Sequence, residues 1–257
     1  MLVLLVLGAA LSAGLISIFN SNRLTLERNQ ITAEALAQAK TALIGYAAGI
    51  RLDVAGAPRP GDLPCPDINN DGTAGSSCSN GGGTTIGRLP WKTLGLPDLR
   101  DGDGERLWYA VSANFKRNPA TNCLLPGDAG YVAGAEAGCL NSDSRGTITI
   151  RDSSGTIIND GTTISGVIAI VIAPGAVLQR QGVAAAQDRS CIIGTNCDVT
   201  EKCTTSPALN TPKCNPVNYL DVLAGVEDNA DFVDSNANGF VNGNILDVNG
   251  KLIVNDR

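Results

Sequence analysis

The stretch MLVLLVLGAALSAGLISIF, residues 1–19, contains no charged side chain and is long enough to form one apolar helical segment. At about 1.5 Å per residue it would extend roughly 28 Å, close to the thickness of the hydrocarbon core of a bilayer. The first charge is Arg23, and no basic residues precede the apolar run as they would in a secretory signal peptide. We therefore expect that a basic leader has been removed and that Met1 is the processed N-terminus.

The helix is expected to continue beyond this run, since residues 21–50 contain no proline and show helical spacing of polar and apolar residues. The polar positions are Glu27, Gln30, Glu34, Gln38, Thr41 and Gly45, and the apolar positions are Ile31, Ala35, Ala39, Ala42, Tyr46 and Ile50, with Leu36, Leu43 and Ala47 beside them. The pattern predicts one helix of about 50 residues, ~75 Å long. Its first half is apolar all round, and its second half is amphipathic and packs on a domain. Pro58 and Pro60 would end any continuation.

This layout resembles the type IV pilins and the pseudopilins of type II secretion. In that family, which carries a class III signal, a prepilin peptidase cuts after a glycine, and an apolar helix begins the mature chain. The resemblance covers residues 1–50 well and the rest only in outline. It implies a subunit held in the inner membrane, methylated at its terminus, and moved by an assembly machinery into an extracellular filament of copies of itself. The residues expected to serve assembly are Met1 and Leu5 and the small residues Gly8, Ala10 and Gly14, which permit close helix approach.

Leu5 departs from the family pattern. Most members carry a glutamate at the fifth mature position, where it neutralises the terminal amine of a neighbouring subunit. One minor pseudopilin, the tip subunit, lacks this glutamate, as do some divergent pilins. The sequence therefore leaves open a shaft pilin, a tip pseudopilin, and a membrane-anchored extracellular binding domain that never polymerises.

The rest of the chain carries eight cysteines, and an even count after a membrane-length segment fits an oxidising compartment. No C-x-x-C pair and no histidine is present, which argues against structural zinc. The order of the cysteines suggests four local disulfides, and the alternative is a set of free buried thiols. The expected pairs are Cys65–Cys78, Cys123–Cys139, Cys191–Cys197 and Cys203–Cys214.

We expect two units, a helix over residues 1–50 and an extracellular domain over 51–257, in an α+β fold whose helix packs on an antiparallel sheet. Residues 51–146 are rich in Gly, Pro, Asp and Asn, which predicts ordered loops with short helical pieces. Within them, the segment 87–115 supplies an apolar core cluster. Its members are Trp91, Leu94, Leu96, Leu107, Trp108 and Val111.

The C-terminal half of the domain shows strand patterns. Thr147–Arg151 and Thr156–Ile158 flank the turn sequence DSSG and predict a hairpin. Residues 166–175 predict a fully buried strand of the same sheet. Residues 188–218 predict a disulfide-stapled loop, and residues 244–254 predict one or two final strands.

Two stretches resemble calcium-binding loops, because DINNDG at 67–72 and DSNANG at 234–239 both fit D-x-[DN]-x-[DN]-G. The candidate ligands are Asp67, Asn69 and Asp71 in the first loop and Asp234, Asn236 and Asn238 in the second, with Asp228, Asp231 and Asp247 as further ligands there. The acidic residue expected at the twelfth position is missing from both, where Cys78 and Ile245 stand. The alternative is that these are turns, which Asp, Asn and Gly favour. Calcium is the only cofactor that the sequence suggests.

Composition argues against other functions. The formal net charge is −6 with no basic cluster, so nucleic-acid binding is not expected. The absence of histidine and of a G-x-S-x-G motif removes the usual catalytic base and nucleophile patterns, and we expect no enzyme. Paired carboxylates can catalyse the hydrolysis of glycosidic bonds, and the chain has a group of four acidic residues: Asp98, Asp101, Asp103 and Glu105. We expect them instead to make turns and to pair with Arg100 and Arg106.

Overall fold

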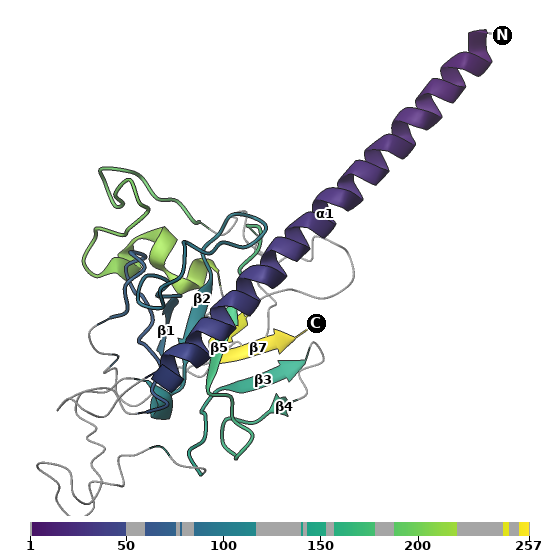
Figure 1. The fold of residues 1–257 in the computed structure, drawn as a ribbon. Helices are drawn as coiled ribbons and strands as arrows, with labels where there is room; N and C mark the ends of the chain where they lie inside the picture. The colour runs from purple at the N-terminus through teal and green to yellow at the C-terminus, as the bar shows by residue number, and fades with distance from the viewer. Residues whose placement is uncertain are drawn as a thin grey trace, which may run out of the picture.

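The computed structural model describes residues 2–49, 60–75, 78, 85–116, 140, 143–152, 157–177, 188–219, 244–246 and 252–256. For residues 2–22, 113, 151–152, 209, 217, 244–246 and 252–256 it describes the backbone alone. The fold is α+β, with one long N-terminal helix packed with an antiparallel sheet (Figure 1).

The helix α1 spans Leu2–Gly49, 48 residues, which corresponds to about 72 Å at the usual rise. Figure 1 shows that only its C-terminal part lies against the domain, while its N-terminal part projects away from it. The single continuous helix predicted from the sequence is confirmed. The structure describes only the backbone of residues 2–22, so it does not test the prediction that the first half of the helix is apolar all round.

The first sheet contains β1 (Thr85–Arg88), β2 (Trp108–Val111) and β5 (Ala169–Ile172), all antiparallel, with β2 in the centre. Every residue of β2 is buried, and its side chains alternate between two apolar clusters, as strand geometry requires. Tyr109 and Val111 join one cluster, and Trp108 and Ala110 join the other. The first cluster includes Ala35, Ala39 and Leu43 of α1, so the helix covers one face of this sheet.

The second sheet has the order β4-β3-β7-β6. Strands β3 (Thr149–Asp152) and β4 (Ile157–Asn159) form the predicted antiparallel hairpin, with a register shift at Ile150. Strands β6 (Asn244–Leu246) and β7 (Leu252–Asp256) confirm the predicted final strands. The pairing of β3 with β7 is parallel, so this second sheet is mixed and not antiparallel throughout.

Two strand predictions are wrong. The segment 51–146 was expected to hold loops and short helical pieces, yet it supplies β1 and the central strand β2. The strand in residues 166–175 was expected to be fully buried in the sheet of the hairpin. Instead β5 pairs with β2 at the edge of the other sheet, and of its residues only Ile172 is buried. An edge strand covered by a helix on one face leaves part of its surface open.

The amphipathic half of α1 is held to the domain by the turn at Gly102. The Gly102 N–H donates to Thr32 Oγ1 at 2.9 Å, and Arg28 pairs with Asp103 at 3.4 Å. A Cβ on Gly102 would collide with the carbonyl oxygen of Arg28. The covered face begins near this turn, which explains why Ile31, at the start of the apolar positions of the helix, is 43% exposed whereas Ala35 is buried.

We predict that Gly102→Ala lowers the free energy of unfolding by about 1–3 kcal/mol, because the added methyl group must push the turn away from α1. The matched control is Gly45→Ala, where nothing lies within 4 Å of the added carbon. In that helical position alanine should raise the free energy of unfolding by up to ~1 kcal/mol. Urea unfolding of the full chain in detergent, followed by tryptophan fluorescence, measures both. Changes of the same sign would contradict the prediction.

Candidate functional site

The surface of α1 is the leading candidate for a functional site, because large apolar side chains lie uncovered along it. Leu24, Leu26 and Ile44 are 58%, 69% and 60% exposed. Upstream of Arg23 the sequence of the projecting part carries no charge at all. A helix that leaves this much apolar surface open is suited to contact with lipid or with another protein.

The residues predicted to serve assembly fall on the projecting part of α1. Leu5, Gly8, Ala10 and Gly14 lie in the helix, where the structure describes the backbone alone, and Met1 lies outside the described residues. Among the described residues, no helix combines the length and the apolar content needed to cross a membrane.

An apolar groove of about 850 Å³ runs beside the C-terminal half of α1. Leu36, Leu43, Ile44, Ala47 and Ala48 line its helix side, and Pro60, Gly61, Leu63, Phe115, Ile168, Ala169 and Val171 line the domain side. Lys40 is the one charged side chain among the described lining residues. Among the described residues, the lining of the groove therefore offers no convergent polar groups of the kind that catalysis or recognition of a polar ligand would need.

On the other face of the first sheet, Arg88 is buried between two aromatic rings. Its Cζ lies 4.3 Å from the centroid of the Trp108 ring and 4.2 Å from that of Tyr219. Its Nη1 donates to the carbonyl of Arg106 and its Nη2 to that of Lys213, both at 2.8 Å. Cation–π contacts and charge-assisted hydrogen bonds thus fix the segment that contains Tyr219 to the sheet.

Glu105 supplies the negative charge for this cluster. Its carboxylate lies 3.0 Å from Lys213 Nζ and 4.0 Å from both Arg88 Nη2 and Arg189 Nη1. Arg189 in turn lies over the Tyr219 ring, at 4.3 Å. No local pattern in the sequence indicates this cluster, because its members are far apart in the chain, with Lys213 108 residues from Glu105 and 125 from Arg88.

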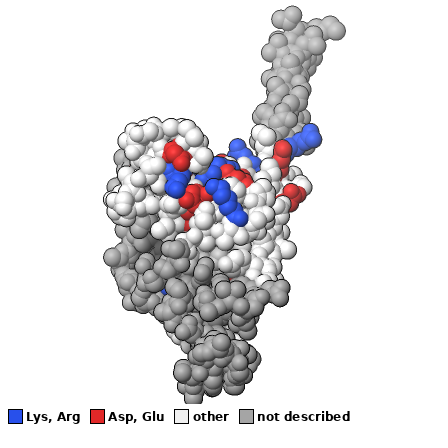
Figure 2. Space-filling model, turned by 60° about the vertical axis from the view of Figure 1, so that its left-hand side comes forward, with Lys and Arg blue, Asp and Glu red and all other residues white. Residues whose placement is uncertain are grey.

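Of the four acidic residues, Asp98 pairs with Arg100 and Arg106 as predicted, whereas Asp103 pairs with Arg28 and Glu105 with Lys213. Asp98 accepts from Arg106 Nε at 2.7 Å and from Arg106 Nη2 at 2.9 Å, and it also pairs with Arg100 at 2.9 Å. Burial alone would raise the pKa of Asp98, but the hydrogen bonds from Arg106 and Arg100 outweigh it and lower that pKa. Asp101 accepts the backbone N–H groups of Asp103 and Glu105, which makes the expected turn. Figure 2 shows acidic and basic side chains interspersed on one face of the molecule.

The first calcium-like loop uses its oxygens to hold its own backbone. Asp67 is 1% exposed and accepts the N–H groups of Asn69 at 3.0 Å and Gly72 at 2.6 Å. Asp71 accepts the N–H of Thr73 at 2.8 Å and pairs with Lys202 Nζ at 3.0 Å. This geometry is that of the Asp/Asn/Gly turn, the alternative named above.

Neither calcium loop is established as a metal site. In the described part of the chain, no group of three or more His, Cys, Asp or Glu residues is placed to hold a metal ion. The second loop, with Asp234, Asn236 and Asn238 and the further ligands Asp228, Asp231 and Asp247, lies outside the described residues. Calcium binding there stays a prediction.

Asp67 predicts a pH dependence of stability. Burial raises its pKa from 3.8 to about 6, against the lowering effect of the Gly72 N–H. As the pH falls through 6 towards 4, the folded chain binds a proton that the unfolded chain does not, so this group makes folding more favourable. The gain approaches ~3 kcal/mol, and it is lost again as the pH rises to about 6. The variant Asp67→Asn should lack this gain.

Urea unfolding of the full chain and of Asp67→Asn at pH 4, 5, 6 and 7 tests this prediction. Asp71 and Asp98 have lowered pKa values in the fold, so their effect on stability changes with pH in the direction opposite to that of Asp67. Subtracting the free energy of unfolding of Asp67→Asn from that of the unchanged chain removes their contribution. As the pH falls, the free energy of unfolding of the unchanged chain should rise relative to that of Asp67→Asn. A difference that stays constant over this range would refute it.

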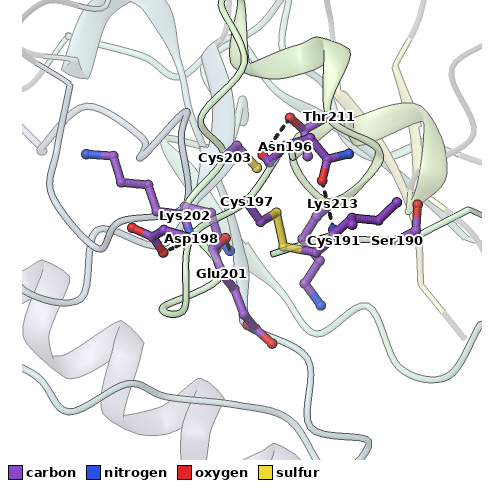
Figure 3. Close-up of a disulfide and its surroundings, with 12 residues drawn as sticks. Ser190, Cys191, Asn196, Cys197, Asp198, Glu201, Lys202, Cys203, Thr211 and Lys213 are labelled. Atoms are coloured by element: carbon purple, nitrogen blue, oxygen red, sulfur yellow. Dashed lines mark hydrogen bonds between the residues drawn. A yellow bond between two sulfur atoms is a disulfide. The ribbon is translucent and has the colours of Figure 1, made fainter. Parts of the chain in front are cut away.

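Disulfides join the cysteines that the sequence analysis paired. The bonds are Cys65–Cys78, Cys191–Cys197 and Cys203–Cys214, and Cys123–Cys139 lies outside the described residues. Figure 3 shows Thr211 turned towards Asn196, whose carbonyl accepts from Thr211 Oγ1 at 3.3 Å. The N–H of Cys203 donates to the carbonyl of Asn69 at 2.8 Å, so this segment is also tied to the first loop.

No protein-family model matches this chain, and no curated protein or solved structure is significantly similar to it.

Proposed function

We propose that this chain is a structural subunit of a type IV pilus or a related pilin-like extracellular filament, and that it polymerises through α1. The observation that carries the proposal is the 48-residue helix, of which the domain covers only the C-terminal part. The uncovered part has a charge-free sequence upstream of Arg23. A long apolar helix is not stable alone in water, so it needs lipid or other helices around it.

The domain fits the outside of such a filament. Its disulfides suit an oxidising extracellular compartment, and each contributes stability of about 2–4 kcal/mol in loop-entropy terms. Before assembly, α1 would be stored in the inner membrane. In the filament, the helices of many copies would bundle at the core and the domains would coat them.

A structural role also fits the state of the acidic side chains. Asp98 is engaged by two arginines, Asp101 by backbone N–H groups, and Glu105 by Lys213. A catalytic carboxylate pair would need to face a substrate instead. We therefore propose a structural role for these acidic side chains.

A minor pseudopilin at the filament tip is the second candidate, and Leu5 is the observation that favours it. The two candidates differ in stoichiometry, since a shaft subunit repeats along the filament and a tip subunit occurs once.

Electron microscopy of filaments sheared from the cell surface, labelled with an antibody against the domain, tests the proposal. A shaft subunit predicts labels along the whole length. Label at one end alone would favour the tip subunit. Filaments without label, with the chain retained in the membrane, would favour an anchored binding domain that does not polymerise.

A further inference from the structure

A second pocket, of about 440 Å³, lies where several loops of the domain meet. Its volume is within the range of roughly 300–1,000 Å³ that is typical of small-molecule sites. Among the described residues, three cations and three carboxylates line it, and we name it the mixed-charge pocket: Lys92, Arg100, Arg106, Asp71, Asp98 and Glu201. None of its described lining residues belongs to a strand, so an extended peptide finds no sheet edge to pair with there.

Arg106 fixes the shape of the mixed-charge pocket. Its Nη1 donates to the carbonyl of Asn70 at 2.9 Å and to that of Thr200 at 3.1 Å. Its Nε and Nη2 donate to the Asp98 carboxylate, and the Arg106 side chain is 8% exposed. Two loops that are distant in the chain are thereby tied to one buried guanidinium. The pocket is therefore formed before a ligand arrives, which lowers the entropy cost of binding.

Glu201 has an unusual backbone conformation at this pocket. Its φ is +64°, in the left-handed region that residues with a side chain rarely adopt. Asn70, with a φ of +63°, donates from Nδ2 to the carbonyl of Glu201 at 2.7 Å and holds it in place. Figure 3 shows the Glu201 side chain pointing away from the Cys191–Cys197 disulfide. Backbone strain of this kind persists where surrounding contacts impose it, and it clusters at binding sites.

Glu201 and Lys92 offer hydrogen-bonding groups that the contacts within the domain do not use up. Glu201 Oε2 accepts from Arg100 Nη2 at 3.1 Å, whereas Glu201 Oε1 accepts no hydrogen bond from the described residues. Lys92 Nζ donates to the carbonyl of Asp71, and an ammonium group has three N–H donors. The pocket therefore presents both an acceptor and donors to a ligand.

The charges that line the pocket cancel, and this balance selects the class of ligand. A charged ligand would bring a charge without a counter-charge, or would have to separate an existing pair such as Arg100 and Asp98. The hydroxyl groups of a neutral sugar both donate and accept, so they can bond to both signs of charge. A sugar ring also has apolar C–H groups, and the lining includes Trp91 and the 81% exposed Val199.

We infer that the mixed-charge pocket binds a neutral saccharide, whose hydroxyl groups donate to Glu201 and accept from Lys92. Arg106 is a positioning residue, because its donors hold the loops and Asp98. This inference goes beyond the proposed function and does not depend on it, since the domain presents the same pocket on a filament or on a membrane anchor. It would add recognition of glycans to the structural role of the chain.

Binding of the full chain to an array of defined glycans tests this inference. The array carries neutral mono- to tetrasaccharides, sialylated and sulfated glycans, and neutral tetrapeptides. The chain is kept in a polyoxyethylene detergent, because a glycoside detergent would compete for the pocket. We expect neutral saccharides to bind, and the same saccharides in solution to change the tryptophan fluorescence, since Trp91 lines the pocket.

Glu201→Ala and Lys92→Met should each weaken the binding of neutral saccharides about tenfold or more, because each removes a hydrogen bond to a charged group. The matched control is Glu34→Ala, since Glu34 is exposed on α1, where it bonds to Gln30. This variant should bind saccharides as the unchanged chain does. Urea unfolding should show that all three variants remain folded.

Three results would overturn the inference: no binding of neutral saccharides, binding of acidic glycans or peptides in their place, and equal binding by all the variants. Each of them would leave the proposed function standing, because the labelling of filaments is measured separately. Filaments without label would in turn leave the saccharide site standing, since the array reports binding by the full chain whether or not it polymerises.

Discussion

Ala10→Arg is expected to abolish filaments and to leave the domain folded. Ala10 lies in the projecting part of α1, within a run of residues that carries no charge. If copies of α1 bundle in the filament core, the arginine would be a buried cation without a partner, which costs several kcal/mol for each subunit. Since each 1.4 kcal/mol is about a tenfold change in an equilibrium constant, no filament should survive.

The matched control for this variant is Ala10→Met, which adds an unbranched side chain of similar length without a charge. It should retain filaments, so that bulk and charge are separated. Electron microscopy counts the filaments, and urea unfolding of the full chain checks the domain. Normal filaments from Ala10→Arg would show that α1 does not form the core and would favour a simple membrane anchor.

Glu105→Gln is expected to lower the free energy of unfolding by about 3–5 kcal/mol, a large part of the total stability of a typical domain. The carboxylate of Glu105 lies against Lys213, Arg88 and Arg189, and its loss would leave cations in the protein interior without their counter-charge. The same change would loosen the segment 188–219, which these contacts hold to the sheet.

Glu201→Gln is the matched control for Glu105→Gln. Glu201 pairs with Arg100 at 3.1 Å, but its side chain is 37% exposed, so its loss should cost under ~1 kcal/mol. Urea unfolding followed by the fluorescence of Trp91 and Trp108 measures both variants. Equal effects would show that the Glu105 cluster gives no special stability to the domain.

The parts of the fold that follow from neighbouring residues could be predicted. The spacing of apolar residues indicated α1, the turn sequence between two short runs indicated the β3–β4 hairpin, and the order of cysteines indicated three bonds that the structure contains. The pairing of Asp98 with Arg100 and Arg106 was also expected, because these residues lie close together in the chain.

The parts that depend on distant residues could not be predicted. All four residues of β2 are buried, so its sequence shows no alternation of polar and apolar residues that would predict a strand. Its side chains point alternately to the cluster with α1 and to the cluster with Ile148, which only the fold reveals. The stack of Arg88 with Trp108 and Tyr219 joins three separate segments, and no local pattern indicates it. The same holds for the parallel pairing of β3 with β7, which lie about a hundred residues apart.

Helical reconstruction of the filaments by cryo-electron microscopy would locate each helix relative to the filament axis. If α1 drives polymerisation, the copies of α1 will bundle along the axis through residues 2–22, with the domains on the outside and each α1 covered by neighbouring helices. Filaments whose axis is occupied by another protein, with this chain bound only to the surface, would contradict it.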